Sequence, residues 1–192
     1  MKVRESGMPA EPQWAMFFEP RRMLQNLDFS ECKADVVDFG CGYGTFSLAA
    51  AAMTAGTVYA IDVEPEMIKT TSQKAQSLGL TNVRVVERDF LARGTELAAA
   101  SVGYAMLFNI LHAEEPLALL REAYRVLAAG GLVSVMHWIP DPSTPRGPPM
   151  AIRPRPEQCR DWVRQAGFEL KRPYVELPPY HYGVVGQKPG LR

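Results

Sequence analysis

Short apolar runs alternate with longer amphipathic stretches from residue 31 to residue 137. Apolar runs of about four to eight residues are typical of buried strands, whereas apolar positions three or four residues apart are typical of helices. This pattern predicts strands at residues 36–39, 57–61, 83–87, 102–108 and 132–137. It predicts helices at residues 45–54, 65–78, 96–100 and 117–127, the last closed by a pair of glycines.

The chain then changes character, because residues 138–156 are rich in proline. Proline fixes φ and lacks an N–H donor, so this segment is predicted to be a long loop, and long loops in compact domains are usually functional. A helix follows at 157–165, and strands follow at 168–176 and 181–187. Only four residues separate these two strands, so they are predicted to pair antiparallel.

Strands that alternate with helices indicate βαβ units and a mainly parallel sheet. The sequence therefore predicts one α/β domain over residues 1–192, with a doubly wound sheet of about seven strands and an antiparallel final strand. Residues 1–30 have apolar positions at helical spacing and are predicted to be a helical cover of the sheet or a lid. Ligands of such sheets bind beyond the carboxyl ends of the strands.

Composition narrows the class of partner. The 192 residues contain 21 Lys or Arg and 21 Asp or Glu, giving a formal net charge of +0, so no overall field favours nucleic acid or an anionic membrane. No apolar run approaches the roughly 18 residues of a membrane span, and the start of the chain lacks the apolar core of a signal peptide. The three cysteines are too scattered for a metal site or a disulfide framework, which favours a reducing, cytoplasmic setting.

Three alternate glycines, Gly40, Gly42 and Gly44, follow the first predicted strand. They allow the backbone to approach a ligand closely, and the next helix points its free N–H groups toward that ligand. Thr45 stands where the dinucleotide fingerprint requires glycine or alanine, and no lysine follows Gly44 as it does in a phosphate loop. The turn therefore indicates a ligand other than a dinucleotide or a nucleoside triphosphate, which disfavours an NAD-dependent oxidoreductase.

Polar residues follow the next three predicted strands. Asp62 can accept hydrogen bonds from both hydroxyls of a ribose, or it can cap the helix at Pro65. Asp89 can accept from an adenine amino group while Phe90 stacks on the base, or the two can be a solvated acid and a core side chain. Asn109 offers both a donor and an acceptor at the sheet edge.

The segments VVDFGCGYG, VYAIDVEPEMI, VERDF, LFNILH and REAYRVLAAGGLVSVMHW resemble class I S-adenosylmethionine-dependent methyltransferases, and more narrowly the small single-domain enzymes of the type-11 group. The resemblance covers residues 35–137. It implies a Rossmann-like fold, S-adenosyl-L-methionine as cofactor and S-adenosyl-L-homocysteine as product. It implies cofactor contacts from Asp38, Gly40 and Gly42 at the methionine portion, Asp62 at the ribose, Asp89 and Phe90 at the adenine, and Asn109 near the methionyl group.

The resemblance implies that a methyl group moves to a nucleophile, and an acceptor with a hydroxyl or ammonium group would need a general base. His112 and His137 follow strands on the predicted ligand side, so each is a candidate base, or else a residue that only packs at a strand end. The alternative to an enzyme is a non-catalytic S-adenosylmethionine-binding protein or an inactive partner subunit.

The acceptor is expected to be a small molecule and not nucleic acid, because the sequence shows neither a large inserted domain nor a basic face. Arg146, Arg153 and Arg155 lie in the proline-rich loop and could pair with an anionic acceptor, or they could be solvated. A metalloid acceptor would need clustered thiols, and Cys32, Cys41 and Cys159 are far apart in sequence. The sequence leaves the oligomeric state open.

Overall fold

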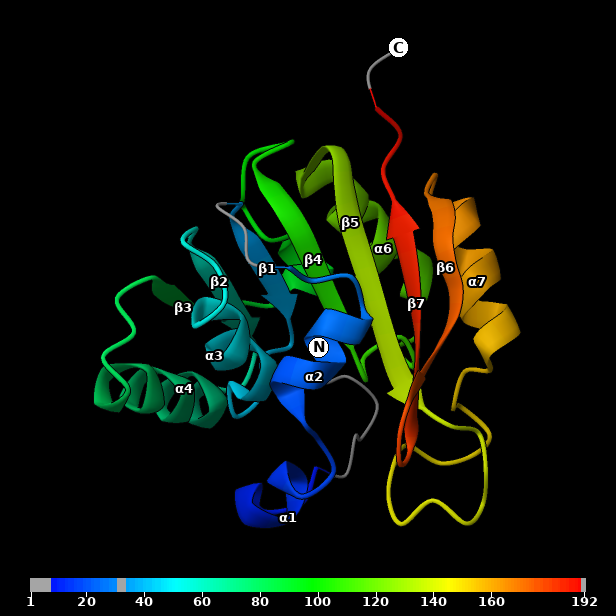
Figure 1. Cartoon of the computed structure of the whole chain (residues 1–192), viewed down its shortest axis with the longest axis horizontal. Coiled ribbons are helices and arrows are strands. Elements are labelled where there is room, and N and C mark those ends of the chain that lie inside the picture. Colours follow the sequence, from blue (N-terminus) through cyan, green and yellow to red (C-terminus); the bar gives the residue numbers. More distant parts are fainter. Residues whose placement is uncertain (1–7, 31–33, 191–192) are drawn as a thin grey trace.

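Seven of the apolar runs form the strands of a single sheet in the computed structural model, which describes residues 8–30 and 34–190 (Figure 1). The strands are β1 (Val36–Phe39), β2 (Val58–Asp62), β3 (Val83–Glu87), β4 (Val102–Phe108), β5 (Leu127–Trp138), β6 (Glu169–Leu177) and β7 (His181–Gln187). The helices are α1 (Glu11–Ala15), α2 (Pro20–Asn26), α3 (Thr45–Ala51), α4 (Pro65–Ser77), α5 (Phe90–Arg93), α6 (Pro116–Val126) and α7 (Pro156–Gln165).

The strand order is β3-β2-β1-β4-β5-β7-β6. Strands β1 to β5 pair in parallel, and β7 pairs antiparallel with both β5 and β6. This confirms the predicted Rossmann-like, mainly parallel sheet with an antiparallel final strand. The order reverses between β1 and β4, so the crevice for a ligand lies at the carboxyl ends of these two strands.

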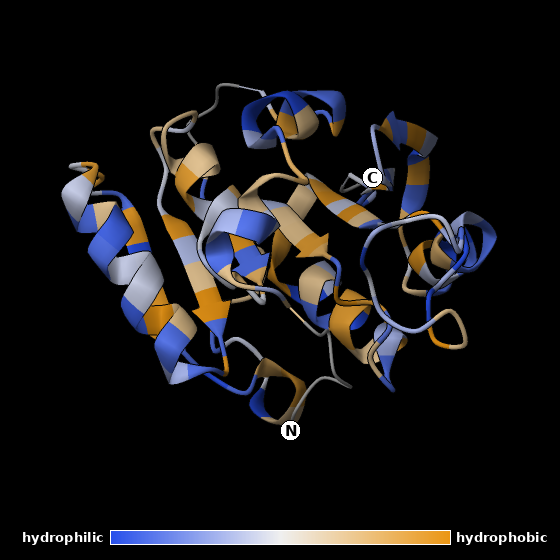
Figure 2. Ribbon diagram, turned by 90° about the horizontal axis from the view of Figure 1, so that it is seen from below, coloured by the Kyte–Doolittle hydropathy of each residue, from blue (hydrophilic) through white to orange (hydrophobic). Residues whose placement is uncertain are grey.

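Two apolar clusters fill the two faces of the sheet. One contains buried side chains of α5, α6 and α7, and the other contains those of α2 and α3. Helix α4 packs on β2 and β3. Viewed from the carboxyl ends of the parallel strands, the strands are mostly hydrophobic while the helices carry hydrophilic residues (Figure 2). No helix within the described ranges is long and apolar enough to cross a membrane.

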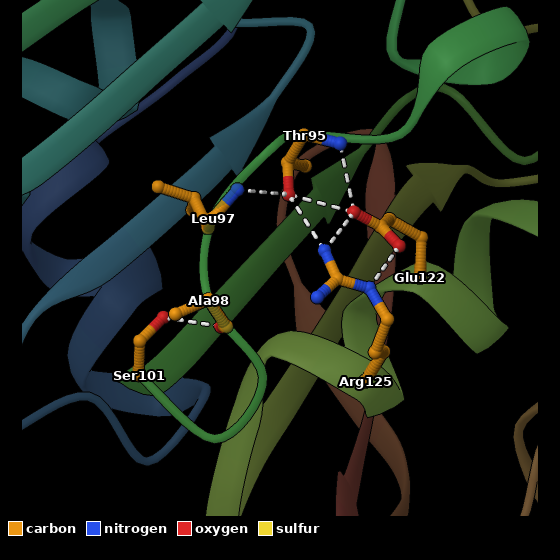
Figure 3. A network of polar contacts seen from close by, with 6 residues as sticks. All are labelled: Thr95, Leu97, Ala98, Ser101, Glu122 and Arg125. Atoms are coloured by element: carbon orange, nitrogen blue, oxygen red, sulfur yellow. Dashed lines mark hydrogen bonds and ion pairs between the residues drawn. The ribbon is translucent and has the colours of Figure 1, made fainter.

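The prediction of a helix at 96–100 is wrong. This segment is an irregular loop, and side chains of α6 bind the residue that precedes it. Glu122 accepts hydrogen bonds from the backbone N–H of Thr95 at 2.7 Å and from its hydroxyl at 2.6 Å, while Arg125 binds the same carboxylate at 2.7 Å (Figure 3). Burial raises the pKa of Glu122, but these hydrogen bonds outweigh it and lower the pKa to about 2. Glu96 and Ala100 have φ of 59° and 55°, outside the helical region.

The junction of α6 and β5 also differs from the prediction. Strand β5 begins at Leu127, directly after the last residue of α6, and not at residue 132. Leu127 directly follows the helix and pairs with Val102, whereas Leu132 pairs with Tyr104, so the intervening residues bulge. The glycines expected to close the helix lie inside this bulge. Gly130 there has φ of 79° and donates its N–H to the carbonyl of Lys188 beyond β7.

Strand β6 lies at one edge of the sheet and is irregular. Its pairing with β7 shifts register on both sides of Arg172, and Pro173 lies within the strand. Lys171 and Arg172 both form ion pairs with Asp28, at 3.3 Å and 2.9 Å. This edge is therefore fastened to the segment that follows α2.

Candidate active site

A cavity of about 400 Å³ lies at the carboxyl ends of β1, β2 and β4. The structure brings together there all but one of the residues predicted to contact the cofactor: Asp38, Gly40, Gly42, Asp62, Phe90 and Asn109. The N-terminal segment and the loop at 139–155 complete its walls, and both lie at this end of the sheet (Figure 1).

The glycine turn between β1 and α3 is tightly enclosed. Gly40 has φ of 77°, and a Cβ added there would lie 2.9 Å from the Cδ1 of Ile110. Gly44 has φ of 75°, and a Cβ there would lie 2.8 Å from Thr71 of α4. The Thr71 hydroxyl also donates to the carbonyl of Gly42 at 2.9 Å. Side chains at Gly40 and Gly44 would therefore collide with neighbouring residues, and the turn presents the backbone of Gly40 and Gly42 to the cavity.

Asp62 fastens the end of β2 to this turn. Its carboxylate accepts a hydrogen bond from the N–H of Gly42 at 2.8 Å and another from the N–H of Glu64 at 3.0 Å. The N-cap residue of α4 is Glu64, and its side chain makes no capping hydrogen bond. Asp62 therefore binds the backbone N–H of the N-cap residue and not an N–H of the first helical turn. Burial raises the pKa of Asp62, and these backbone hydrogen bonds oppose the rise.

Asp38 is a buried carboxyl group that lines the cavity. It accepts a hydrogen bond from the Ser47 hydroxyl at 2.5 Å. Burial raises the pKa of Asp38 to about 7, the Ser47 hydrogen bond lowers it, and the charge of Asp62 raises it further. A cationic ligand in this cavity would favour the ionised carboxylate.

The buried Asp38 should make the stability of the free protein depend on pH. Its pKa is about 7 when folded and near 3.8 in an exposed chain, so its favourable contribution is complete below about pH 4 and disappears as the pH rises through 7. We expect the unfolding free energy of wild type relative to Asp38→Asn to fall by about 2.5 kcal/mol between pH 5 and 8. Urea unfolding at several pH values measures this difference, in which the contributions of the histidines cancel. Parallel pH profiles of the two proteins would contradict the assignment.

Asn109 directly follows β4 and lines the cavity in a strained conformation. Its φ is 55°, which is unusual for a residue other than glycine. Both polar atoms of its amide are buried, and neither has a hydrogen-bond partner among the residues described. Strain together with unsatisfied buried polar atoms indicates a ligand that supplies the missing partners.

Asp89 and Phe90 lie at the start of α5, and only Phe90 lines the cavity. The carboxylate of Asp89 accepts from the N–H of Ala92 at 3.0 Å as the N-cap of this helix, and it does not line the cavity. Phe90 lines the cavity while its ring packs edge-to-face on Phe39, with the centroids 5.5 Å apart. An adenine contact by Asp89 stays a prediction, because this residue does not line the cavity.

The candidate bases His112 and His137 lie next to each other, and neither is among the residues that line the cavity. Nδ1 of His112 is 3.3 Å from Nε2 of His137, and both side chains are buried. Burial and the neighbouring His112 lower the pKa of His137 well below its ordinary value. His181 is also buried, against the rings of Phe18 and Trp138, and burial lowers its pKa to about 3. This placement gives no support to a histidine base, so that role stays a prediction.

The loop at 139–155 has no helix or strand and is built around Arg153. The guanidinium group, with the residue only 9% exposed, donates to the Thr144 hydroxyl and to several carbonyl groups of the loop. These carbonyls belong to Ile139, Asp141, Arg146 and Pro148. The expectation that Arg153 meets an anionic acceptor is therefore corrected, because its donors are used inside the loop. Arg155 is exposed outside the cavity, and only Arg146 lines it.

The N-terminal segment closes the open side of the cavity. Pro9 and Trp14 line it, and the Tyr43 hydroxyl donates to the Pro9 carbonyl at 3.2 Å. Glu11 of α1 forms an ion pair with Lys74 of α4. This segment therefore bridges α4 and the glycine turn.

Sequence reasoning missed several residues that line the cavity. They are Phe46, Val63, Glu64, Met67, Phe108 and Trp138. Each is the last residue of a strand, part of the short link after a strand, or part of the first turn of the next helix. That position in the sequence pattern could have identified them as cavity residues. Of the three cysteines, Cys41 lines the cavity, Cys159 is buried in α7, and Cys32 lies outside the described residues.

Comparison with known proteins adds to this geometry. Residues 36–131 match the family described as "Methyltransferase domain". A crystal structure of an S-adenosylmethionine-dependent methyltransferase from Aquifex aeolicus is 27% identical, with a TM-score of 0.82 over 92% of this chain and 93% of that one. The [4+2]-cyclase SpnF has the same fold, with a TM-score of 0.77 at 18% identity over 98% of this chain and 87% of that one.

A curated relative, the ribosomal protein L11 methyltransferase of Legionella pneumophila strain Paris, is 31% identical over 50% of this chain and 30% of its own length. The chain spans about a third of the length of such curated relatives, between 24% and 39%.

Proposed function

The chain belongs to the methyltransferase-domain family, and from that premise we propose that it transfers the methyl group of S-adenosylmethionine to a small-molecule acceptor bound in the same cavity. The observation that carries the proposal is the convergence of the bare glycine turn, the Asp62 carboxylate and the unsatisfied amide of Asn109 in one cavity.

The residues present suit the proposed cofactor. Gly40 and Gly42 present their backbone to the cavity, and Asn109 offers a donor and an acceptor that lack partners among the described residues. The carboxylates of Asp38, Asp62 and Glu64 suit a ligand with a positive charge and with hydroxyl groups. Bound S-adenosylmethionine supplies an electrophilic methyl group.

The contribution of the chain to the reaction is mainly positional. The glycine turn and Asn109 would hold one reactant, and the aromatic residues Trp14 and Trp138 would hold the other while they exclude water. We propose that the loop at 139–155 forms the acceptor side and that α1 serves as a lid. A cytoplasmic location is part of the same proposal.

A small molecule suits this cavity better than a protein side chain does. The L11 methyltransferases are named for a protein substrate, but this chain matches only about a third of their length. Here the N-terminal segment and the loop at 139–155 both lie over the cavity. A large substrate would have to displace one of them.

Binding measurements test the cofactor assignment. We expect calorimetry to show S-adenosylhomocysteine binding in the range of about micromolar, which corresponds to roughly −8 kcal/mol, and no measurable binding of NAD. Thr45 at the third position of the dinucleotide fingerprint is the reason for this selectivity. Binding of NAD as tight as that of S-adenosylhomocysteine would overturn the proposal.

The alternative is a protein that binds S-adenosylmethionine without transferring its methyl group. The buried histidine pair, which does not line the cavity, favours this reading over one with a histidine base. Turnover separates the two, by release of S-adenosylhomocysteine from labelled cofactor in the presence of pooled small-molecule acceptors. Tight cofactor binding with no turnover on any pool would favour the alternative.

A further inference from the structure

The cavity has two chemically different halves. The carboxyl groups of Asp38, Asp62 and Glu64 lie on the side formed by the ends of β1 and β2. The other side is aromatic, with rings from Trp14, Phe46, Phe108 and Trp138. The proposed cofactor accounts for the acidic side. The aromatic side is therefore the part of the cavity that determines the acceptor.

The aromatic rings are fixed by contacts with one another. Phe46 packs edge-to-face on Phe108, with centroids 4.8 Å apart. Phe18 joins Trp14 at 4.8 Å to Phe46 at 5.3 Å. Such a packed set presents rigid flat walls, and flat apolar molecules bind walls of this kind well.

Arg146 supplies a positive charge at the rim of this aromatic side. It is the single cationic residue that lines the cavity within residues 8–30 and 34–190. In the described part of the chain, its guanidinium group donates one hydrogen bond, to the amide oxygen of Gln13 at 3.3 Å, and no carboxylate pairs with it. A guanidinium group without an acidic partner is well suited to a carboxylate, sulfonate or phosphate group.

Arg146 is also held in place by its own loop. Its carbonyl accepts from the buried guanidinium group of Arg153 at 3.2 Å. The next residue, Gly147, has φ of 123° and packs so closely on Arg153 that a Cβ would lie 2.6 Å from Nη2. The backbone that carries the cation is therefore fixed on both sides of the peptide bond between these two residues.

We propose that the acceptor is a planar aromatic molecule with an anionic group that pairs with Arg146. This inference rests on the proposed function, because it assigns to an acceptor the half of the cavity that the cofactor does not need. An amine acceptor, such as a lysine side chain, fits less well, because Arg146 repels a positive charge and the aromatic half has no carboxylate.

Two probes of the same shape and opposite charge test this inference. Calorimetry at pH 7.5 compares 2-naphthoate with 2-naphthylmethylamine on protein saturated with S-adenosylhomocysteine. We expect 2-naphthoate to bind at least about tenfold more tightly. Arg146→Gln should weaken 2-naphthoate about tenfold and leave the amine unchanged or improved. The matched control is Arg155→Gln, from the same loop but outside the cavity, and it should change neither affinity.

The inference is overturned if the amine binds as well as 2-naphthoate, if neither probe binds, or if Arg146→Gln leaves the affinity for 2-naphthoate unchanged. Titrating S-adenosylhomocysteine alone keeps this result separate from the proposed function. If that ligand fails to bind, the proposed function fails, and the two probes titrated on the free protein still decide the charge preference. Circular dichroism of each variant checks that the fold is retained.

Discussion

Asp62→Ala is expected to weaken S-adenosylhomocysteine binding by about ten- to hundredfold. A hydrogen bond to a charged group contributes about 1.5–3 kcal/mol, and the carboxylate is proposed to accept from the ribose. It also accepts from Gly42 and Glu64, so its removal loosens the glycine turn as well. We therefore expect the melting temperature of the free protein to fall together with the affinity. Calorimetry and thermal melting measure the two effects.

A modified ligand distinguishes the two roles of Asp62, which are the proposed contact with the ribose and the hydrogen bond that holds the glycine turn. If Asp62 binds a ribose hydroxyl, the variant should lose much less affinity for an analogue of S-adenosylhomocysteine that lacks the 2′-hydroxyl than for the parent compound. Equal losses for the two ligands would show that the residue acts only through the turn. Glu66→Ala, an exposed acid in the first turn of α4, is the control and should bind like wild type. Asp62→Asn keeps one acceptor and should lie between wild type and Asp62→Ala.

Arg153→Met is expected to unfold the loop at 139–155 without unfolding the protein. The substitution keeps an apolar stem but removes the donors that satisfy the surrounding carbonyl groups and the Thr144 hydroxyl, at a cost of about 3 kcal/mol within the loop. Turnover should fall by at least about tenfold, because the acceptor wall is lost. Binding of S-adenosylhomocysteine should change little, because its proposed site is built on β1, β2 and β4.

Trypsin provides a direct readout of this loop. The bonds after Arg153 and Arg155 precede proline and resist cleavage, which leaves the bond between Arg146 and Gly147 as the cleavable one. Cleavage there should be much faster in Arg153→Met than in wild type. Arg155→Met is the control and should be as resistant as wild type. A resistant Arg153→Met variant would show that the loop keeps its conformation without the guanidinium group.

Local pattern was enough to predict the sheet. The apolar runs at 36–39, 83–87, 102–108 and 181–187 form strands with the predicted bounds. The order of apolar and polar side chains that distinguishes a strand from a helix can be read directly from the sequence. Most of the cavity could be predicted for the same reason, because parallel strands end at one edge and the residues after them must meet there.

What could not be predicted depends on contacts between distant residues. Residues 96–100 have helical composition, but Glu122 and Arg125 hold the neighbouring loop in another conformation. Arg153 looked available for a ligand because its partners are backbone carbonyls, which every residue has and no sequence pattern reveals.

The irregular edge strand β6 has a consequence for how the protein behaves among its own copies. An outermost strand exposes a row of backbone donors and acceptors that a second chain can pair with, which leads to aggregation. In β6 that row is broken by Pro173, which has no N–H, and by the register shifts around Arg172. Lys171 and Arg172 add positive charge along the same stretch. Any redesign that regularises β6 for greater rigidity would remove this protection and create a template for fibre growth.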